Sequence, residues 1–281
     1  MNGVTPLFEA QHEDRYARQG LIRKYQELTG SNLIVMIDQI FPPGITVLEE
    51  LLHGLDPLKP LHLLLASPGG DGETSIRIIR SLQARCTKLT VLVPDMAKSA
   101  ATMVCLGADE IMYGPAGDLG PVDPQMRFPG GSLVSAKELV EAVDEAERRI
   151  KESPETFPLF ASLLENVSMV MVEQARSALD RSESLVSEAL RANGKRSEDD
   201  VAELAKALHR PLIEEPRSHS AVFSCGDAAR FGLPAVDADV SSEEWSIVWS
   251  LWTRYFSMGA FPVGPVAVYE GETASQILGP S

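Results

Sequence analysis

One serine stands where a nucleophile could be activated. Residues 94–102 (PDMAKSAAT) follow a short apolar run, and Ser99 lies among small residues that are expected to open a helix. The N–H groups in the first turn of a helix have no partner within it and carry positive partial charge. A hydroxyl there can attack a carbonyl carbon while the N–H of Ala100 stabilises the oxygen that becomes negative. The alternative is that Ser99 only caps the helix, the commonest use of serine at that place.

Two adjacent glycines form a second candidate motif. Residues 66–72 (ASPGGDG) follow another apolar run. Gly69 and Gly70 allow a sharp turn and a close approach of backbone N–H groups to a ligand, although a plain turn before a helix would use the same residues. Ligand sites of parallel sheets lie at the carboxyl ends of the strands. If the strands before the two motifs are neighbours, Gly69 or Gly70 and Ala100 would form an oxyanion hole beside Ser99.

The elements that must position these motifs alternate between strands and helices. Apolar runs predict strands at residues 32–38, 61–66, 89–93 and 110–113. Helical patterns lie between them at 45–55, 72–82 and 99–106, and in the second half at 136–151, 160–193, 198–208 and 226–231. Short apolar strands separated by helices indicate a parallel sheet covered on both faces. The predicted fold class is therefore α/β with a helical C-terminal half.

The chain is divided into three parts by these patterns. Residues 1–13 are expected to be a loose N-terminal tail, residues 14–240 one domain, and residues 241–281 a C-terminal helix and tail. In the last part Trp245, Trp249 and Trp252 are spaced four and three apart, as on one face of a helix. We expect this face to pack internally or to contact another subunit.

Composition excludes several classes of function. The formal net charge of −15 and the lack of a Lys/Arg cluster argue against a nucleic-acid partner. Cys86, Cys105 and Cys225 show no paired spacing and are expected to be free thiols in a reducing compartment. No basic region followed by an apolar run stands near Met1, so no secretory signal is predicted and a cytoplasmic location is expected. No apolar run approaches the roughly 20 residues of a membrane helix, and no membrane segment is predicted. The absence of metal-binding and nucleotide-binding motifs predicts that no cofactor or metal is used.

Three motifs in order carry a family resemblance. The runs ASPGG, AKSAATMVCLGADEI and LGPVDPQ resemble the serine dehydrogenase proteinase family, which is similar to ClpP, to signal peptide peptidase A and to the archaeal stomatin-cleaving protease. The likeness extends to residues 21–26 and 226–233 and covers most of residues 14–237. It implies a ClpP/crotonase-like fold with repeated β-β-α/β-α units, a serine peptidase acting on a peptide or protein substrate, and a homo-oligomer.

The resemblance also assigns roles to residues. Ser99 matches the nucleophile of the family, and Gly69 and Gly70 match its oxyanion-hole glycines, with the N–H of Ala100 as the second donor. Residues 119–124 match the segment that lines the site.

The general base departs from the ClpP pattern. ClpP-like proteins carry a histidine about 25 residues after the serine, but residues 121–125 read PVDPQ, and no histidine stands between His62 and His209. A Ser–His–Asp triad would have to use a distant residue such as His219, because triads are assembled in space.

A lysine is the alternative, because two of the similar proteases use a Ser–Lys dyad. Lys137 and Lys151 are the first lysines after Ser99. The spacing of Ser135 and Glu138 is typical of a capping box and places Lys137 in the first turn of a helix. The helix dipole there disfavours a positive charge, whereas a general base must be a neutral amine. We therefore expect a dyad of Ser99 and Lys137, with a solvated surface lysine as the alternative for Lys137.

Other residues and functions are kept open. The side chain of Lys98 should diverge from that of Ser99 and is expected to be structural or to line the rim of the site, and Asp123 is a candidate substrate-binding residue. A crotonase-type acyl-CoA enzyme would use the same backbone donors without a covalent serine, but few basic residues lie near the motifs to hold the CoA phosphates. A non-catalytic assembly subunit would keep the fold and lack a working base.

Overall fold

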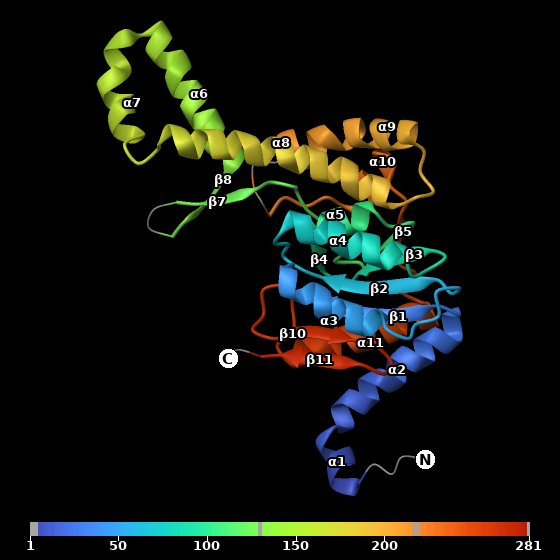
Figure 1. Cartoon of the computed structure of the whole chain (residues 1–281). Coiled ribbons are helices and arrows are strands. Elements are labelled where there is room, and N and C mark those ends of the chain that lie inside the picture. The colour runs from blue at the N-terminus through green and yellow to red at the C-terminus, as the bar shows by residue number, and fades with distance from the viewer. Residues whose placement is uncertain (1–4, 129–130, 216–217, 219, 280–281) are drawn as a thin grey trace.

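A seven-stranded sheet forms the centre of the molecule (Figure 1). The computed structural model describes residues 5–128, 131–215, 218 and 220–279. The strand order is β11-β10-β1-β2-β3-β5-β9. The strands are β1 (Asn32–Ile37), β2 (Leu61–Ala66), β3 (Leu89–Val93), β5 (Glu110–Tyr113), β9 (Ala235–Asp237), β10 (Ala267–Glu270) and β11 (Ser275–Leu278).

The sheet is parallel from β1 to β9 and antiparallel at its other edge. Strands β1, β2, β3, β5 and β9 pair in parallel, whereas β10 runs antiparallel to β1 and β11 antiparallel to β10. The four predicted strands lie where the apolar runs placed them, with β1 one residue shorter than expected. The predicted α/β class is confirmed.

Helices cover both faces of the sheet. One face carries α2 (Glu13–Thr29) and α11 (Glu243–Ser257), and the other carries α3 (Pro42–Leu52), α4 (Gly72–Gln83), α5 (Ala100–Leu106) and α8 (Met169–Ala192). Within β1, Leu33 and Val35 join the core on the α2 side, while Ile34 and Met36 join the core on the α4 side. Alternate side chains of a strand point to opposite faces. Because both faces are covered, the strand is apolar without interruption from Leu33 to Ile37.

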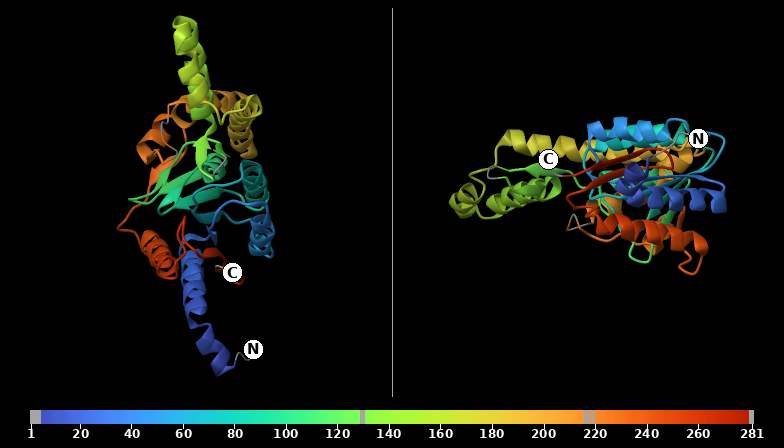
Figure 2. Two further views of the ribbon diagram at one scale, coloured as in Figure 1. Left: turned by 90° about the vertical axis from the view of Figure 1, so that its left-hand side faces the viewer. Right: turned by 90° about the horizontal axis from the view of Figure 1, so that it is seen from below.

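A helical arm projects from this body. Helices α6 (Ala136–Glu152) and α7 (Phe157–Leu163) extend away from the sheet, and α8 leads from the arm back onto the body (Figures 1 and 2). The remaining elements are α1 (Pro6–Gln11), β4 (Met96–Ala97), β6 (Asp118–Leu119), β7 (Gln125–Arg127), β8 (Leu133–Ser135), a 3₁₀ turn (Pro154–Thr156), α9 (Glu198–His209), a π turn (Arg210–Glu214) and α10 (Cys225–Arg230). Across the described residues, no helix is both long enough and apolar enough to span a membrane.

The described residues near both termini contain more regular structure than the sequence suggested. The expected tail at residues 1–13 contains α1, whose first turn is capped by the Thr5 hydroxyl accepting from the Phe8 N–H at 3.4 Å. The helix expected in residues 241–281 is present as α11, but the chain then adds β10 and β11 to the central sheet. The prediction of a C-terminal tail is therefore wrong.

The tryptophan face divides between core and surface. Trp245 and Trp252 are each 5% exposed and pack in the core beneath the sheet, whereas Trp249 is 48% exposed. Internal packing therefore accounts for two of the three tryptophans. The three cysteines are free, with Cys105 buried and Cys86 and Cys225 half-buried.

A buried ion pair fixes the added strand β10. The Arg18 guanidinium donates to both carboxylate oxygens of Glu270, from Nε at 2.7 Å and from Nη2 at 3.1 Å. The two residues are 2% and 0% exposed. The Tyr255 and Ser275 hydroxyls also donate to this carboxylate, each at 2.7 Å. The network joins α2, α11 and β10.

We expect Arg18→Leu to lower the free energy of unfolding by about 3–5 kcal/mol, because Glu270 would remain as a buried charge without its partner. The matched control is Arg23→Leu, which removes the exposed pair of Arg23 with Glu272 and should cost less than about 1 kcal/mol. Urea denaturation of the two variants measures the difference. Equal losses would contradict the assignment of Arg18–Glu270 as the pair that holds β10.

Candidate active site

Two turns meet at the carboxyl edge of the sheet. Strands β2 and β3 are parallel neighbours, with Leu64 opposite Leu92, as the sequence argument required. A Cβ on Gly69 would lie 2.7 Å from the Lys98 carbonyl oxygen and 2.8 Å from Ser99 Cβ. The glycine turn after β2 and the serine turn after β3 are therefore packed backbone against backbone.

Ser99 has an unusual backbone conformation. Its φ is 51° and its ψ is −115°, and no other residue except glycine has a positive φ in the part of the chain that the structure describes. Such a conformation costs on the order of 1–3 kcal/mol and persists only where the surroundings enforce it. A sharp, strained strand-to-helix turn also exposes the nucleophile of α/β-hydrolases.

The capping interpretation of Ser99 is wrong. Ser99 directly precedes α5, yet its side chain makes no capping hydrogen bond. By contrast, the hydroxyls of Ser135 and Ser242 accept from backbone N–H groups of α6 and α11. The half-buried hydroxyl of Ser99 is therefore left available for other chemistry.

A small hollow of about 220 Å³ lies beside Ser99. Met103, Val122 and Leu185, from α5, the segment after β6 and α8, give it an apolar lining. Asp71 and Asp123 add carboxylates. The hollow is thus formed by parts of the chain that are far apart in sequence.

The charged rim of the hollow is held by ion pairs. Arg181 of α8 donates to both carboxylate oxygens of Glu73, at 2.6 and 2.8 Å, and to Glu188 at 2.7 Å. These contacts link the first turn of α4 to α8, which forms one wall of the hollow. Sequence reasoning missed this contribution of α8, because no motif marks it.

The backbone N–H groups of the glycine turn differ in their partners. The Gly69 N–H donates to Ser67 Oγ at 3.1 Å. The Ile40 N–H donates to the Gly69 carbonyl at 2.8 Å, and the Ile40 carbonyl accepts from the Asp71 N–H at 2.7 Å. Alternate residues of a parallel strand bond on opposite sides, so the N–H of the intervening Gly70 faces the side of β3.

The Ala100 N–H is a further backbone donor, directly after Ser99 in the chain. It occupies the first position of α5, where an N–H has no acceptor within the helix. Over the described residues, neither this group nor the Gly70 N–H is bonded to an acceptor.

Lys137 lines a second hollow, whereas Ser99 lines the first. The second hollow has a volume of about 660 Å³. As predicted, Ser135 caps α6, accepting from the Glu138 N–H at 3.3 Å, and places Lys137 in the first turn. The Lys137 amine donates to the Glu214 carbonyl. Its Nζ also lies 3.9 Å from the carboxylate of Glu141.

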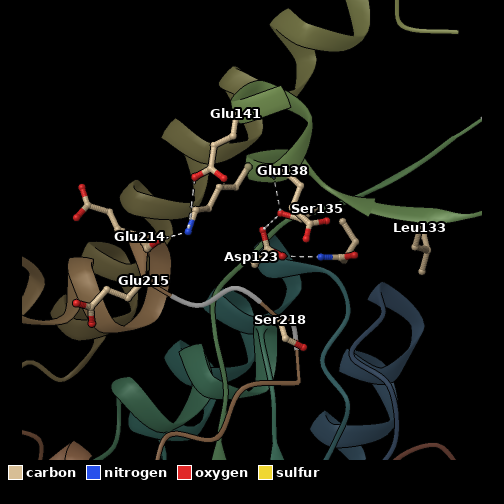
Figure 3. Close-up of a pocket in the computed structure, with 10 residues that line it drawn as sticks. Asp123, Leu133, Ser135, Glu138, Glu141, Glu214, Glu215 and Ser218 are labelled. Atoms are coloured by element: carbon tan, nitrogen blue, oxygen red, sulfur yellow. Dashed lines mark hydrogen bonds and ion pairs between the residues drawn. The ribbon is translucent and has the colours of Figure 1, made fainter. Parts of the chain in front are cut away.

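Asp123 connects the two hollows, because it lines both. Its carboxylate accepts from Ser135 Oγ at 2.7 Å and from Gln125 Nε2 at 2.6 Å (Figure 3). The carboxylate therefore fixes the capping serine of α6 next to the Ser99 hollow. His219, the distant histidine considered for a triad, lies outside the described residues.

Lys98 is structural, as expected. It is 6% exposed, and its ammonium donates to the Asp118 carboxylate and to the Leu119 carbonyl at 2.9 Å. Sequence reasoning did not identify Asp118 as the partner of Lys98, nor Asp95 as its neighbour. Burial and the nearby Asp118 carboxylate raise the pKa of Asp95.

The chain matches one protein family over residues 4–152, described as ClpP-like SDH-type serine proteinases. The matched segment contains both turns and Lys137. The chain belongs to this family.

Two relatives from Methanocaldococcus jannaschii are similar to this family member. The uncharacterized protein MJ0137 is 27% identical over 247 residues, which cover 83% of this chain and 77% of the relative. The uncharacterized protein MJ1495 is 32% identical over 130 residues, which cover 41% of this chain and 44% of the relative.

Solved structures are more distant. A variant of the 1510-N membrane-bound stomatin-specific protease is 15% identical with a TM-score of 0.46, covering 76% of this chain and 81% of that chain. A ClpP1 variant from Listeria monocytogenes is 14% identical with a TM-score of 0.38, covering 76% of this chain and 94% of that chain.

In this ClpP-like proteinase, glycine is the residue that would relieve the strained turn. We expect Ser99→Gly to exceed Ser99→Ala in free energy of unfolding by about 1 kcal/mol, because alanine keeps the strain at positive φ. Thermal unfolding of the two variants tests this. A Ser99→Ala variant at least as stable as Ser99→Gly would argue against strain at Ser99.

Proposed function

We propose that this chain hydrolyses peptide bonds through an acyl-enzyme on Ser99. The observation that supports this most directly is the state of Ser99. Its hydroxyl caps no helix, its backbone is strained, and the residue lines a hollow. A serine held in this way serves no evident structural purpose. Membership of a serine proteinase family agrees with the proposal.

The oxyanion hole is proposed to consist of the Gly70 and Ala100 N–H groups. Gly69 matches the family glycine, but its own N–H is already bonded to Ser67. Its role is then to let the two turns pack closely. Preorganised backbone donors stabilise a developing oxyanion strongly because they need not reorient during the reaction.

Lys137 is proposed as the general base. Its neutral amine takes the Ser99 proton as Oγ bonds to the scissile carbonyl carbon, and the carbonyl oxygen becomes an oxyanion. When the C–N bond breaks, the ammonium returns that proton to the leaving amine, and an ester on Ser99 remains. Water then attacks the ester, Lys137 accepts its proton, and the proton passes back to Ser99 as the acid is released.

This role requires Lys137 to change partners. Its amine now contacts the Glu214 carbonyl, and it must exchange that contact for Ser99. The adjoining hollows, joined at Asp123, support a short route between the two. Asp123 is proposed to keep the start of α6 beside the substrate through Ser135.

The hollow favours an apolar side chain of a peptide over a CoA ester. Its apolar lining of Met103, Val122 and Leu185 suits the residue before the scissile bond. The carboxylates of Asp71 and Asp123 would repel CoA phosphates. The crotonase-type alternative is therefore disfavoured by the charges around Ser99.

Assembly and location stay predictions. A homo-oligomer would find apolar surface on the arm, where several large side chains are exposed: Phe157, Leu159, Leu163, Met169 and Val170. Light scattering of the purified protein measures the mass of the particle. A cytoplasmic location is inferred from the free cysteines.

We expect Ser99→Ala to abolish both peptide cleavage and covalent labelling by a fluorophosphonate probe, since only an activated serine reacts with it. The matched control is Ser242→Ala, which removes a true capping serine, costs about 1 kcal/mol of stability and should keep full labelling. Mass spectrometry of the labelled peptide identifies the modified residue. Cleavage by Ser99→Ala at the wild-type rate would refute the proposal.

We expect Lys137→Ala and Lys137→Arg to lower the labelling rate at least about 100-fold, in line with the loss of a general base. Arginine is the informative control, because it keeps a hydrogen-bond donor beside the Glu214 carbonyl but cannot accept a proton at any accessible pH. Stopped-flow labelling with matched melting curves measures this. Wild-type reactivity in Lys137→Arg would remove Lys137 from the mechanism.

A further inference from the structure

Lys98, the residue directly before Ser99, donates hydrogen bonds to three acceptors. The Lys98 ammonium donates to the Asp118 carboxylate, to the Leu119 carbonyl at 2.9 Å and to the Ala221 carbonyl at 3.1 Å. An ammonium has three hydrogens to donate. All three are therefore used, and this lysine has no proton-transfer role in the arrangement seen here.

The contacts of Lys98 join the serine turn to β6. Strand β4, immediately before Lys98, pairs in parallel with β6. The aliphatic stem of Lys98 lies directly on Gly120, where an added Cβ would come within 2.3 Å of Lys98 Cδ. The Thr102 hydroxyl strengthens the same connection, because it lies within hydrogen-bond distance of the Ala97 and Gly120 carbonyls, at 2.8 and 2.9 Å, and accepts from the Gly120 N–H at 3.2 Å.

The other side of the turn is fixed by β2. Ser67 N–H donates to the Met96 carbonyl at 2.9 Å, and Lys98 N–H donates to the Ser67 carbonyl at 3.0 Å. Ser99 is thus the first residue beyond a segment clamped on both sides. Its strained conformation requires such enforcement.

We propose that the Lys98–Asp118 ion pair is a positioning device that holds Ser99 in its reactive conformation. The pair is nearly buried, with side chains 8% and 15% exposed, so its geometry is well defined and loss of one charge leaves the other unpaired. Because β6 leads through Gly120 to Asp123, the pair also aligns the wall of the hollow with the nucleophile. The proposal rests on the proposed function of Ser99.

The test uses a variant that removes both charges. Lys98→Met alone leaves Asp118 as an uncompensated buried charge and is expected to destabilise the fold. Lys98→Met combined with Asp118→Asn keeps the stem on Gly120 and avoids that cost. The single change Asp118→Asn serves as a second variant, because it keeps the contacts of Lys98 with the two carbonyls.

We expect the double variant to melt within a few degrees of wild type but to react with a fluorophosphonate about 10-fold or more slowly, since small misplacements of a nucleophile are costly. With a peptide substrate, kcat should fall by the same factor while KM changes less than about twofold. Asp118→Asn should show a smaller loss in the same direction.

The control is Lys195→Met with Asp109→Asn, which removes a more exposed pair with a 2.6 Å contact at the opposite end of the sheet. It should label at the wild-type rate. Wild-type labelling by the Lys98/Asp118 double variant, or a loss of labelling that follows the melting temperature in both pairs alike, would overturn the positioning role. A wild-type protein that is never labelled would instead overturn the proposed function, and the positioning role with it.

Discussion

The backbone of Gly69 lies so close to the turn at Ser99 that no side chain fits between them. This contact is possible because β2 and β3 are adjacent and in register, so that the chain leaves both strands at the same edge of the sheet. It packs the turn that carries Gly70 against the turn that carries Ser99 and Ala100. Any residue larger than glycine at position 69 would push the two turns apart.

Much of this geometry could be predicted from local patterns. Apolar runs located β2 and β3, and small residues after each run marked the turns. The adjacency of the strands was an assumption that the fold confirms. The strain at Ser99 could not be predicted, because a serine that opens a helix has the same sequence pattern whether it caps that helix or not. Only the backbone angles and the missing cap separate the two.

The missed elements have a common physical cause. Strand β10 ends in Glu270, and a charged residue in a short run argues against a buried strand. Its partner Arg18 lies 252 positions away in the sequence. Pairing over such a separation leaves no local signal. The same applies to Asp118 and to Leu185, whose importance comes from neighbours that only the tertiary structure provides.

The proposed site is divided between the body around the sheet and the helical arm. The sheet and the turns that follow it carry Ser99 and the backbone donors, whereas Lys137 is carried by α6 of the arm. Helix α8 belongs to both parts, since it leads from the arm and contributes Leu185 to the hollow. A side chain that fills the hollow would therefore press on the same helix that packs against α6. On the proposed mechanism, substrate binding in the hollow and the approach of Lys137 to Ser99 are therefore mechanically linked.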